Sequence, residues 1–404
     1  MKREISPLLT LLWTIVVWAH CVAIVDAQTA SSSEPNATEL ARMEKYLARR
    51  NDPRIIKTTI HVSDTEDVDC VDRLRQHGYD DPITIASPPT NNPIPLPDRT
   101  PVNGVMARQR YGTETDLCPK DTVPILHLTP ESLKRFNSLE DFYTKNGPWV
   151  SNSTHEYATA NETGNSRAIR SILSSNRPSL ETTEEMSLSQ IWGSATTAAG
   201  VVQTVEAGWQ VWTDKWHDSY PHLFVYYTSD NYVTTGCYNT DCGKFVVYNN
   251  STALGGALAS SNAGGTVYYF ETIYSQNSAG DWWVQINGTY VGYYPNTLFS
   301  APGLKSGSMR DVYGGELAPE QGLGRHSKVD MGTGTFSAGG WGNAAFHSGI
   351  QHCLVGGSWC NWSYSNLTVS QVSKSNCYDL SFADPPTNSA FYFGGPGNPS
   401  AGCN

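Results

Sequence analysis

Two glutamates stand in sequence surroundings that would change the chemistry of a carboxyl group. Glu206 lies in the segment Thr204–Val211 (TVEAGWQV), and Glu316 lies in Tyr313–Leu317 (YGGEL). Apolar and aromatic neighbours exclude water, which raises the pKa of a carboxyl group, and a second carboxyl group in the same site raises one pKa further. Such a pair can activate water with one carboxylate and protonate a leaving group with the other. A glutamate beside glycines is also typical of a turn or a salt bridge, so the two segments alone leave both interpretations open.

Other hydrolytic signatures are missing from the sequence. It contains no H-E-x-x-H zinc motif, no G-x-S-x-G elbow and no C-x-x-C pair. The segment Met331–Gly334 (MGTG) faintly resembles an aspartic-peptidase turn, but it lacks the required aspartate and has no second copy. The two glutamates therefore remain the candidate catalytic residues.

The ends and the composition of the chain indicate a secreted, extracellular protein. Residues 1–27 have basic residues at the start, an apolar run and a small-residue end, which predicts a signal peptide. Eight of the nine cysteines follow this segment, an even number that suits disulfides in an oxidising compartment. Eight N-x-[ST] sequons predict a glycoprotein: Asn36, Asn152, Asn161, Asn249, Asn250, Asn287, Asn361 and Asn366.

Charge and hydropathy argue against two classes of partner. The formal net charge is −11 and Lys and Arg form no run, whereas nucleic-acid binding depends on basic patches that neutralise phosphates. After the first 27 residues no apolar stretch is long enough to span a membrane. We therefore expect neither nucleic acid nor membrane as a partner.

Glycine divides the rest of the chain into two predicted domains. Of 35 glycines, only four precede residue 150, which predicts a first domain at 28–148 and a second at 149–404. The first domain has a proline-rich run at Pro88–Pro101 that is typical of an extended linker. Helical spacing predicts one helix at Ala37–Arg49 and a second that begins at Thr129 and continues through Phe142. The two cysteines of the first domain, Cys70 and Cys118, are expected to form a disulfide.

The second domain has the pattern of an all-β protein. Its apolar and aromatic runs are short and are separated by turn residues such as Asn287-Gly288. The expected strands are Leu223–Thr228, Lys244–Tyr248, Thr266–Tyr274, Trp282–Ile286 and Tyr290–Tyr294. This pattern predicts an antiparallel β-sandwich of two sheets, preceded by a small α+β domain. Cys237 and Cys242, five positions apart, are expected to pair.

A series of short motifs occurs in a fixed order along the second domain. The motifs are EAGW at Glu206–Trp209, LFVYYT at Leu223–Thr228, GCYN at Gly236–Asn239, GDWW at Gly280–Trp283, GYYP at Gly292–Pro295 and GGE at Gly314–Glu316. Together they resemble the neprosin family. Upstream, Asp69–Asp72 and Cys118–Ile125 resemble the activation-peptide domain of that family, and Cys377–Asp379 continues the pattern downstream. The resemblance covers nearly the whole chain after residue 27. Leu317 departs from the valine expected after the second glutamate, which bears on the shape of the site more than on its chemistry.

The resemblance implies a secreted glutamic endopeptidase made as a zymogen. It implies catalytic glutamates at Glu206 and Glu316, peptide or protein substrates cleaved on the carboxyl side of proline, and inhibition by the chain's own pro-domain at 28–148. Activity is expected in acid, where the two carboxyl groups share one proton, and no metal or organic cofactor is needed. Self-cleavage after Pro148 would release the domain at 149–404. Gln190 is a candidate oxyanion donor, although a surface position on a strand is also compatible with its sequence.

Three other points stay open at this level. Trp209, Trp282 and Trp283 are candidates for contact with a substrate proline, although aromatic residues more commonly pack in a core. Exposed aromatic residues on a β-sandwich would equally suit a carbohydrate-binding or cell-wall module without catalysis, since a fold does not fix a function. The chain could also be a family member that has lost activity, against which the presence of both glutamates argues.

Overall fold

The computed structural model describes residues 35–90, 95–98, 102–110, 117–145, 155–356, 359–385, 387–398 and 402–403. Contacts divide the chain into Met1–Ser33 and Glu34–Asn404, and the second unit contains all the described residues. The predicted signal peptide and the predicted cleavage site at Pro148 lie outside them. Among the described residues, no helix has the length and apolar character needed to cross a membrane.

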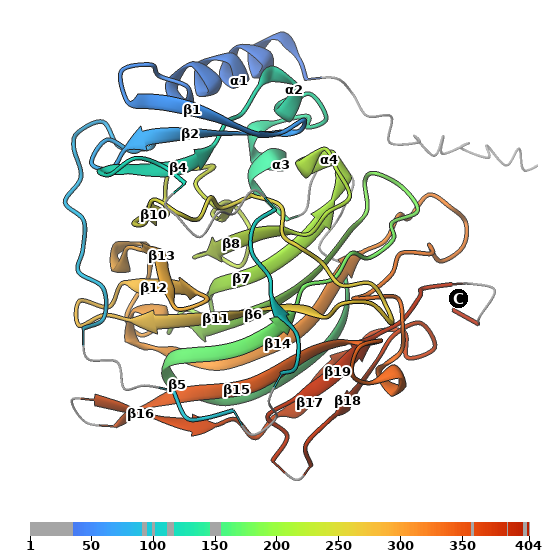
Figure 1. Cartoon of the computed structure of the whole chain (residues 1–404). Helices are drawn as coiled ribbons and strands as arrows, with labels where there is room; N and C mark the ends of the chain where they lie inside the picture. The colour runs from blue at the N-terminus through green and yellow to red at the C-terminus, as the bar shows by residue number, and fades with distance from the viewer. Residues whose placement is uncertain are drawn as a thin grey trace, which may run out of the picture. The chain divides into compact units, whose positions relative to one another are not determined.

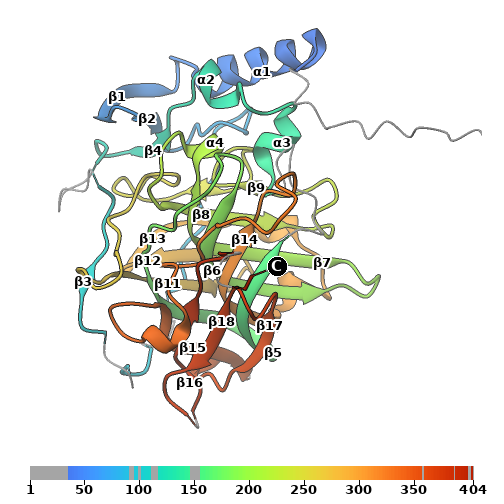
Figure 2. The ribbon, with the colours of Figure 1, turned by 90° about the vertical axis from the view of Figure 1, so that its right-hand side faces the viewer.

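An N-terminal module of helices and one small sheet lies at one end of this unit (Figures 1 and 2). Its three strands are antiparallel and lie in the order β1-β2-β4. The elements are α1 (Ala37–Arg50), β1 (Ile56–Ser63), β2 (Glu66–Asp72), β4 (Thr122–Leu126), α2 (Pro130–Leu133) and α3 (Leu139–Tyr143). The small α+β part expected before the large sheet is therefore present, and it belongs to the same compact unit as that sheet.

The helices of the module begin where side chains can cap them. The Asn36 side chain accepts a hydrogen bond from the Glu39 N–H at 3.0 Å, and α1 then buries Met43 and Leu47, as the predicted helix at Ala37–Arg49 requires. The single helix expected from Thr129 through Phe142 is wrong, because the structure has α2 and α3 with a break between them. Ser138 causes the second start, since its side chain accepts from the Asp141 N–H at 3.1 Å and caps α3.

Most of the remaining chain forms one large curled sheet, whose main path runs β10-β13-β12-β11-β5-β14-β6-β7-β8-β9. Its pairings are antiparallel except for the short β3, which runs parallel to β11. The strands are β3 (Val105–Met106), β5 (Glu156–Ser174), β6 (Met186–Thr196), β7 (Val202–Trp212), β8 (His222–Thr228), β9 (Cys237–Tyr238), β10 (Val246–Val247), β11 (Tyr268–Gln276), β12 (Trp282–Ile286), β13 (Thr289–Tyr294), β14 (Ser308–Ala318), β15 (Ala345–Gly356), β16 (Trp359–Tyr364), β17 (Thr368–Val372), β18 (Asp379–Phe382) and β19 (Phe391–Gly394). The helices between them are α4 (Thr213–Trp216), η2 (Asn296–Leu298), η3 (Leu304–Ser306) and η4 (Ser337–Gly339).

The long strand β5 connects the parts of this sheet. Its first half pairs with β14 and β17, and its second half pairs with β11 and β15. The all-β antiparallel architecture expected from the sequence is confirmed, with hydrogen bonds through β5 joining its layers into one sheet. Every expected strand exists, although Lys244–Tyr248 shortens to Val246–Val247. The core between the layers includes Trp209, Trp282, Tyr313 and Phe393.

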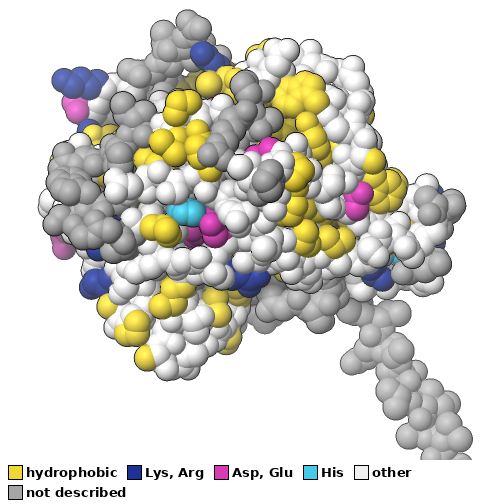
Figure 3. Space-filling view, turned by 90° about the horizontal axis from the view of Figure 1, so that it is seen from below, with side chains coloured by type: hydrophobic (Ala, Val, Ile, Leu, Met, Phe, Trp, Pro, Cys, Tyr) yellow, Lys and Arg dark blue, Asp and Glu magenta, His cyan; other side chains and the backbone are white. Residues whose placement is uncertain are grey.

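Covalent and packing contacts hold the outer segments in place. The predicted disulfides Cys70–Cys118 and Cys237–Cys242 are both present, and Cys377 pairs with Cys403. The described part of the proline-rich run is not free, because the backbone of Leu96 exchanges hydrogen bonds with the Gln351 side chain at 2.8 and 2.9 Å. On the lower face of the unit, charged side chains of both signs are scattered and the basic ones form no large patch among the residues that are drawn in colour (Figure 3).

Candidate active site

Three neighbouring strands bring the two predicted glutamates to one face of the sheet. The central strand β6 lies between β7, which carries Glu206, and β14, which carries Glu316. Glu206 is opposite Trp192, and Glu316 is opposite Leu188. Because side chains alternate along a strand, Leu188, Gln190 and Trp192 share a face, and Gln190 lies between the two glutamates. The structure therefore brings together residues that are 110 positions apart in sequence.

The glycines of the two motifs make room for this arrangement. Gly208 is opposite Gln190 on β6, and a Cβ atom at Gly208 would lie 1.9 Å from the carbonyl oxygen of Ser189. Gly314 is opposite Gln190 on the other side and has a φ of +138°, a conformation that side-chain-bearing residues rarely adopt. A Cβ atom there would lie 2.3 Å from the Ala158 carbonyl oxygen. The glycines of EAGW and GGE are thus needed to pack the strands around Gln190.

Glu206 is completely buried and is held by two hydroxyl donors. Thr204 Oγ1 and the Tyr232 hydroxyl each donate to Glu206 Oε1 at 2.7 Å. Tyr232 belongs to the loop after β8 and has a φ of +62°, an uncommon conformation for a tyrosine. Burial, together with the neighbouring Glu206 carboxylate, raises the Tyr232 pKa well above its ordinary value, so the phenol stays protonated and donates. One oxygen of Glu206 is fixed in this way and the other faces the site.

Glu316 is 3% exposed and has three polar partners. Gln190 Nε2 donates to Glu316 Oε2 at 2.9 Å, and His155 Nδ1 lies 2.5 Å from Oε1. Burial alone would raise the pKa of this carboxyl group, but Lys145 and His155 outweigh the burial and lower the Glu316 pKa to about 2. Glu316 is therefore a carboxylate at all but very acidic pH in this form of the protein.

The third partner, Lys145, comes from the end of the N-terminal module and contacts both glutamates. Its Nζ lies 2.5 Å from Glu206 Oε2, 3.3 Å from Glu316 Oε2 and 3.0 Å from Gln190 Oε1. Lys145 is 5% exposed. A buried ammonium with carboxylate partners neutralises charge that would otherwise be expensive to bury. The cation occupies the space between the two carboxylates, where an attacking water and a substrate carbonyl group would have to bind.

Without that cation, the geometry suits catalysis by two carboxyl groups. Two carboxylates in contact with one small group cannot both ionise easily, so they would share a proton. One could then act as general base toward water while the other donates to a leaving nitrogen. The Gln190 amide N–H group lies between them, where it could donate to developing negative charge on an oxygen atom.

Several residues of this site were not predicted from the sequence. Gln190, Glu206 and Glu316 were, but Lys145, His155 and Tyr232 were not. His155 carries only the weak signal that it precedes the first long strand, and Lys145 only that it lies next to the composition boundary. Tyr232 follows the LFVYYT motif in an irregular loop, so no periodicity places it.

The tryptophans considered for substrate contact lie elsewhere. Trp209, Trp282 and Trp283 have no exposed surface. The indole of Trp209 donates to the Ser174 carbonyl, and that of Trp282 donates to the Leu304 carbonyl. Their role in this structure is core packing, which was the more common interpretation for aromatic residues.

Among the described residues, one group has ligand atoms as close together as a metal site would require, but two of its members are already bonded to each other. The ligand atoms of His326, Cys377 and Cys403 lie within 4.8 Å of one another. The two sulfurs form a disulfide, so they offer no thiolates to a metal.

The fold and the site together define a β-sandwich protein with two buried carboxyl groups at the centre of one face. Comparison with protein families gives a match to the Neprosin family model over residues 183–396, more than half of the chain. The chain belongs to the Neprosin family. This membership and the pair of buried glutamates support a peptidase of the glutamic type.

Solved structures of two peptidases are similar to this chain at low identity. One is a Scytalido-glutamic peptidase with a peptide-based transition state analog, at 12% identity and a TM-score of 0.33, covering 59% of this chain and 97% of that one. Another is SCP-B, a member of the Eqolisin family of peptidases in complex with the tripeptide Ala-Ile-His, at 10% identity and a TM-score of 0.29, covering 59% and 96%. At these scores the similarity carries no conclusion about mechanism.

Proposed function

We propose that this protein is a secreted glutamic endopeptidase made as a zymogen, active in acid and cleaving on the carboxyl side of proline. The observation that carries the proposal is the triad of Glu206, Gln190 and Glu316 on three adjacent strands, buried and held by a single ammonium group. A purely structural pair of glutamates would not need a cation from a separate module to neutralise it. Secretion and proline preference are supported by the sequence features and by the family.

In the proposed reaction, one glutamate acts as general base and the other as general acid. The ionised carboxylate takes a proton from water as the water oxygen attacks the scissile carbonyl carbon. The Gln190 amide and the protonated carboxyl group donate to the oxygen that becomes negative. The protonated carboxyl group then gives its proton to the leaving nitrogen as the C–N bond breaks. The proton taken from water restores the shared proton of the pair.

In this proposal the pro-domain inhibits the enzyme by contributing cations that pair with acidic groups of residues 149–404, called here the sheet domain. Lys145 contacts both proposed catalytic glutamates, Glu206 and Glu316. Farther away, Arg135 pairs with Asp214, and the buried Arg50 has its NH1 3.8 Å from Asp241 Oδ1. Each contact crosses from residues 28–148 to residues 149–404. A module attached by such pairs blocks the site without needing to distort it.

Acid weakens this attachment in the direction that activation requires. The folded-state pKa of Glu316 lies below its ordinary value, so its stabilising contribution is present above about pH 4.5. That contribution is lost progressively as the pH falls toward about 2. Release of Lys145 in acid would then expose two carboxyl groups that share one proton.

Acid treatment of the purified full-length chain tests this function. We expect loss of the module, a new N-terminus at Trp149, and cleavage of an unstructured protein substrate after its prolines. The products are identified by mass spectrometry. A new N-terminus far from Trp149 would reject self-cleavage after Pro148, and cuts without regard to proline would reject the specificity. An acid-treated chain that cuts nothing would favour a binding module.

A further inference from the structure

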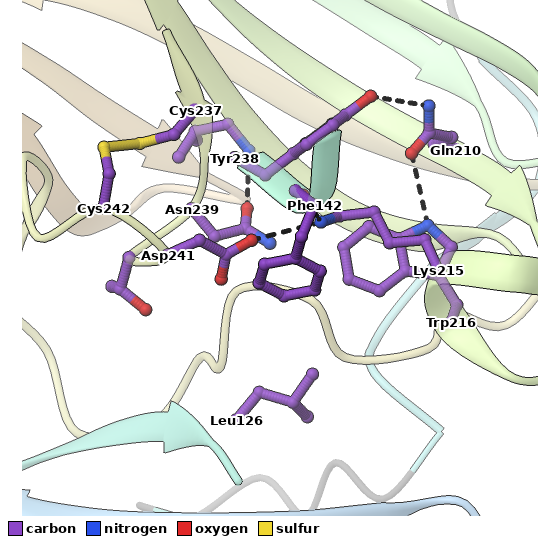
Figure 4. A network of polar contacts seen from close by, with 12 residues as sticks. Leu126, Phe142, Gln210, Lys215, Trp216, Cys237, Tyr238, Asn239, Asp241 and Cys242 are labelled. Carbon is purple, nitrogen blue, oxygen red and sulfur yellow. Dashed lines mark hydrogen bonds and ion pairs between the residues drawn. A yellow bond between two sulfur atoms is a disulfide. The ribbon is translucent and has the colours of Figure 1, made fainter. Parts of the chain in front are cut away.

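A second buried lysine, Lys215, belongs to the sheet domain and lies among aromatic rings from both parts of the chain, a site called here the aromatic pocket. Lys215 belongs to α4, which follows directly after β7, the strand that carries Glu206. Its side chain is 1% exposed. Its Nζ donates to the carbonyl oxygen of Phe142 at 2.7 Å and to Asp241 Oδ2 at 3.2 Å (Figure 4). One of the two acceptors is therefore a main-chain carbonyl of the module, three residues before Lys145.

Aromatic rings from both parts of the chain surround this ammonium group. The ring of Phe142 lies 3.9 Å from Lys215 Nζ, that of Tyr238 4.6 Å and that of Trp216 5.3 Å. Phe136 packs edge-on against Phe142 at 5.3 Å. Cations are attracted to the faces of aromatic rings, so these rings stabilise the lysine where it is largely desolvated.

Contacts within the sheet domain fix two of the rings around Lys215. Gln210 is buried, and its Nε2 donates to the Tyr238 hydroxyl at 2.8 Å while its Oε1 accepts from the Trp216 indole at 3.3 Å (Figure 4). Both rings are thus fixed by a residue on β7. Asp241 supplies the lysine with an ion-pair partner from the same domain. The pocket is therefore preorganised for whatever replaces Phe142.

The pocket is continuous with the catalytic pair. One apolar cluster contains Phe136, Leu139 and Phe142 of the module and a group of sheet-domain residues: Met186, Leu188, Trp212, Trp216, Phe224, Tyr226 and Tyr238. Two of these are the strand partners of the catalytic residues, since Leu188 is opposite Glu316 and Tyr226 is opposite Glu206. An apolar surface thus leads from the two glutamates to Lys215.

We propose that this pocket is a specificity subsite, in which Lys215 donates to a main-chain carbonyl of the substrate and the rings of Trp216 and Tyr238 bind an aromatic side chain. The proposal rests on the proposed function, since the pocket opens only when the module leaves. The module's own chain indicates in which direction a substrate would bind. It contacts Lys215 at Phe142 and the two glutamates at Lys145, so the chain runs from the aromatic pocket toward the glutamates. Thr144 between them has an extended conformation (φ −98°, ψ 161°). A substrate in the same direction places its aromatic residue two or three positions before the residue at the scissile bond.

Paired peptides test the subsite in the acid-treated full-length protein. Each peptide contains one proline and carries phenylalanine at a single position, scanned from the second to the fourth residue on either side of it, with an all-alanine reference. We expect kcat/KM to rise about tenfold for phenylalanine two or three positions before proline, the effect of burying one aromatic side chain. Lys215→Met should lower kcat/KM for the alanine peptide, because it removes the donor to a main-chain carbonyl, and should lower it further for the phenylalanine peptides, because it also removes the cation beside the aromatic ring. Circular dichroism checks that the variant keeps the wild-type fold. Lys328→Met, at an exposed lysine of the sheet domain, is the matched control.

The outcomes separate this inference from the proposed function. Equal cleavage of all peptides would overturn the subsite while leaving the peptidase intact. A rise in kcat/KM only for peptides with phenylalanine after the proline would overturn the assigned direction of the substrate chain and with it the proposal. Absence of any cleavage would overturn the proposed function and the subsite together. Because the peptide series uses the wild-type protein, the result does not depend on whether Lys215→Met folds.

Discussion

Replacing Lys145 by methionine keeps the length of the side chain and removes the ammonium group that lies between Glu206 and Glu316. Moving the Glu316 pKa from 4.5 to about 2 corresponds to about 3 kcal/mol, at about 1.4 kcal/mol per pKa unit. Removing one partner of a buried ion pair costs about 3–5 kcal/mol on general grounds. His155 shares the first figure with Lys145, whereas the second figure applies to the loss of Lys145 alone. We therefore predict that the Lys145→Met chain is about 3 kcal/mol less stable than the wild type at neutral pH.

The pH dependence of this loss is the sharper part of the prediction. With a folded-state pKa of about 2 and an ordinary value of 4.5, the contribution of Glu316 to stability at pH 3 falls below half of its value at pH 7. The difference between variant and wild type should therefore shrink by more than half between pH 7 and pH 3. Urea unfolding of the full-length chains at both values measures it. We also expect the variant to show peptidase activity before acid treatment.

Lys134→Met is the matched control for this experiment. Lys134 lies in the same module, its side chain is 75% exposed, and it forms an ion pair with the exposed Glu131 at 3.7 Å. Its replacement should change stability by less than about 0.5 kcal/mol. If Lys145→Met were as stable as the control at pH 7 and equally inactive, the ammonium would not hold the module on the site, and the reasoning would be wrong.

Three further changes probe other contacts. Tyr232→Phe should lower kcat/KM about tenfold, because one catalytic carboxylate loses a hydrogen bond; peptide cleavage measures this, with Tyr269→Phe as control. Burial alone would lower the His222 pKa, but Asp218 and Glu66 outweigh burial and raise this pKa to about 9. The contribution of His222 to folding stability is therefore full below pH 6.5 and is lost as the pH rises through 9. Thermal unfolding should show this decline, and His222→Gln should lack it. Replacing Cys70 and Cys118 by serine should cost about 2–5 kcal/mol, leaving a zymogen that activates at higher pH, which an activity titration would detect.

Each of these has a contradicting result. Unchanged kinetics in Tyr232→Phe would mean that the hydroxyl does not position Glu206. A melting temperature that stays level above pH 9 would mean that the ion pairs of His222 contribute nothing. An unaltered activation pH in the double serine variant would mean that the stability of the N-terminal module does not control activation.

The sequence predicted the fold where local pattern decides it. Trp282–Ile286 became β12 with the same bounds, because a short run of aromatic and β-branched residues between two turns determines a hairpin strand locally. The helix through Phe142 was wrong because apolar spacing does not reveal that Ser138 begins a new helix. The order of the strands could not be predicted either, since β5 and β14 pair across more than 100 residues.

The candidate site was predictable only in part for the same reason. The glycines beside Glu206 and Glu316 mark positions where strands approach closely, and the motifs that contain them are local in sequence. Lys145 reaches the pair from 61 positions before Glu206, and nothing in its own neighbourhood distinguishes it from a surface lysine. A contact made between two segments that lie far apart in the sequence has no periodic signal in either one.

The central claim is that Glu206 and Glu316 together cut peptide bonds. The most direct measurement is cleavage of a proline-containing peptide at about pH 3–5 by the acid-treated wild type and by Glu206→Gln, Glu316→Gln and Glu271→Gln. We predict that the first two variants keep the wild-type fold by circular dichroism and lose activity by at least about a thousandfold, as loss of a catalytic acid or base would cause, while Glu271→Gln stays active. Activity that persists in either of the first two variants would contradict the account.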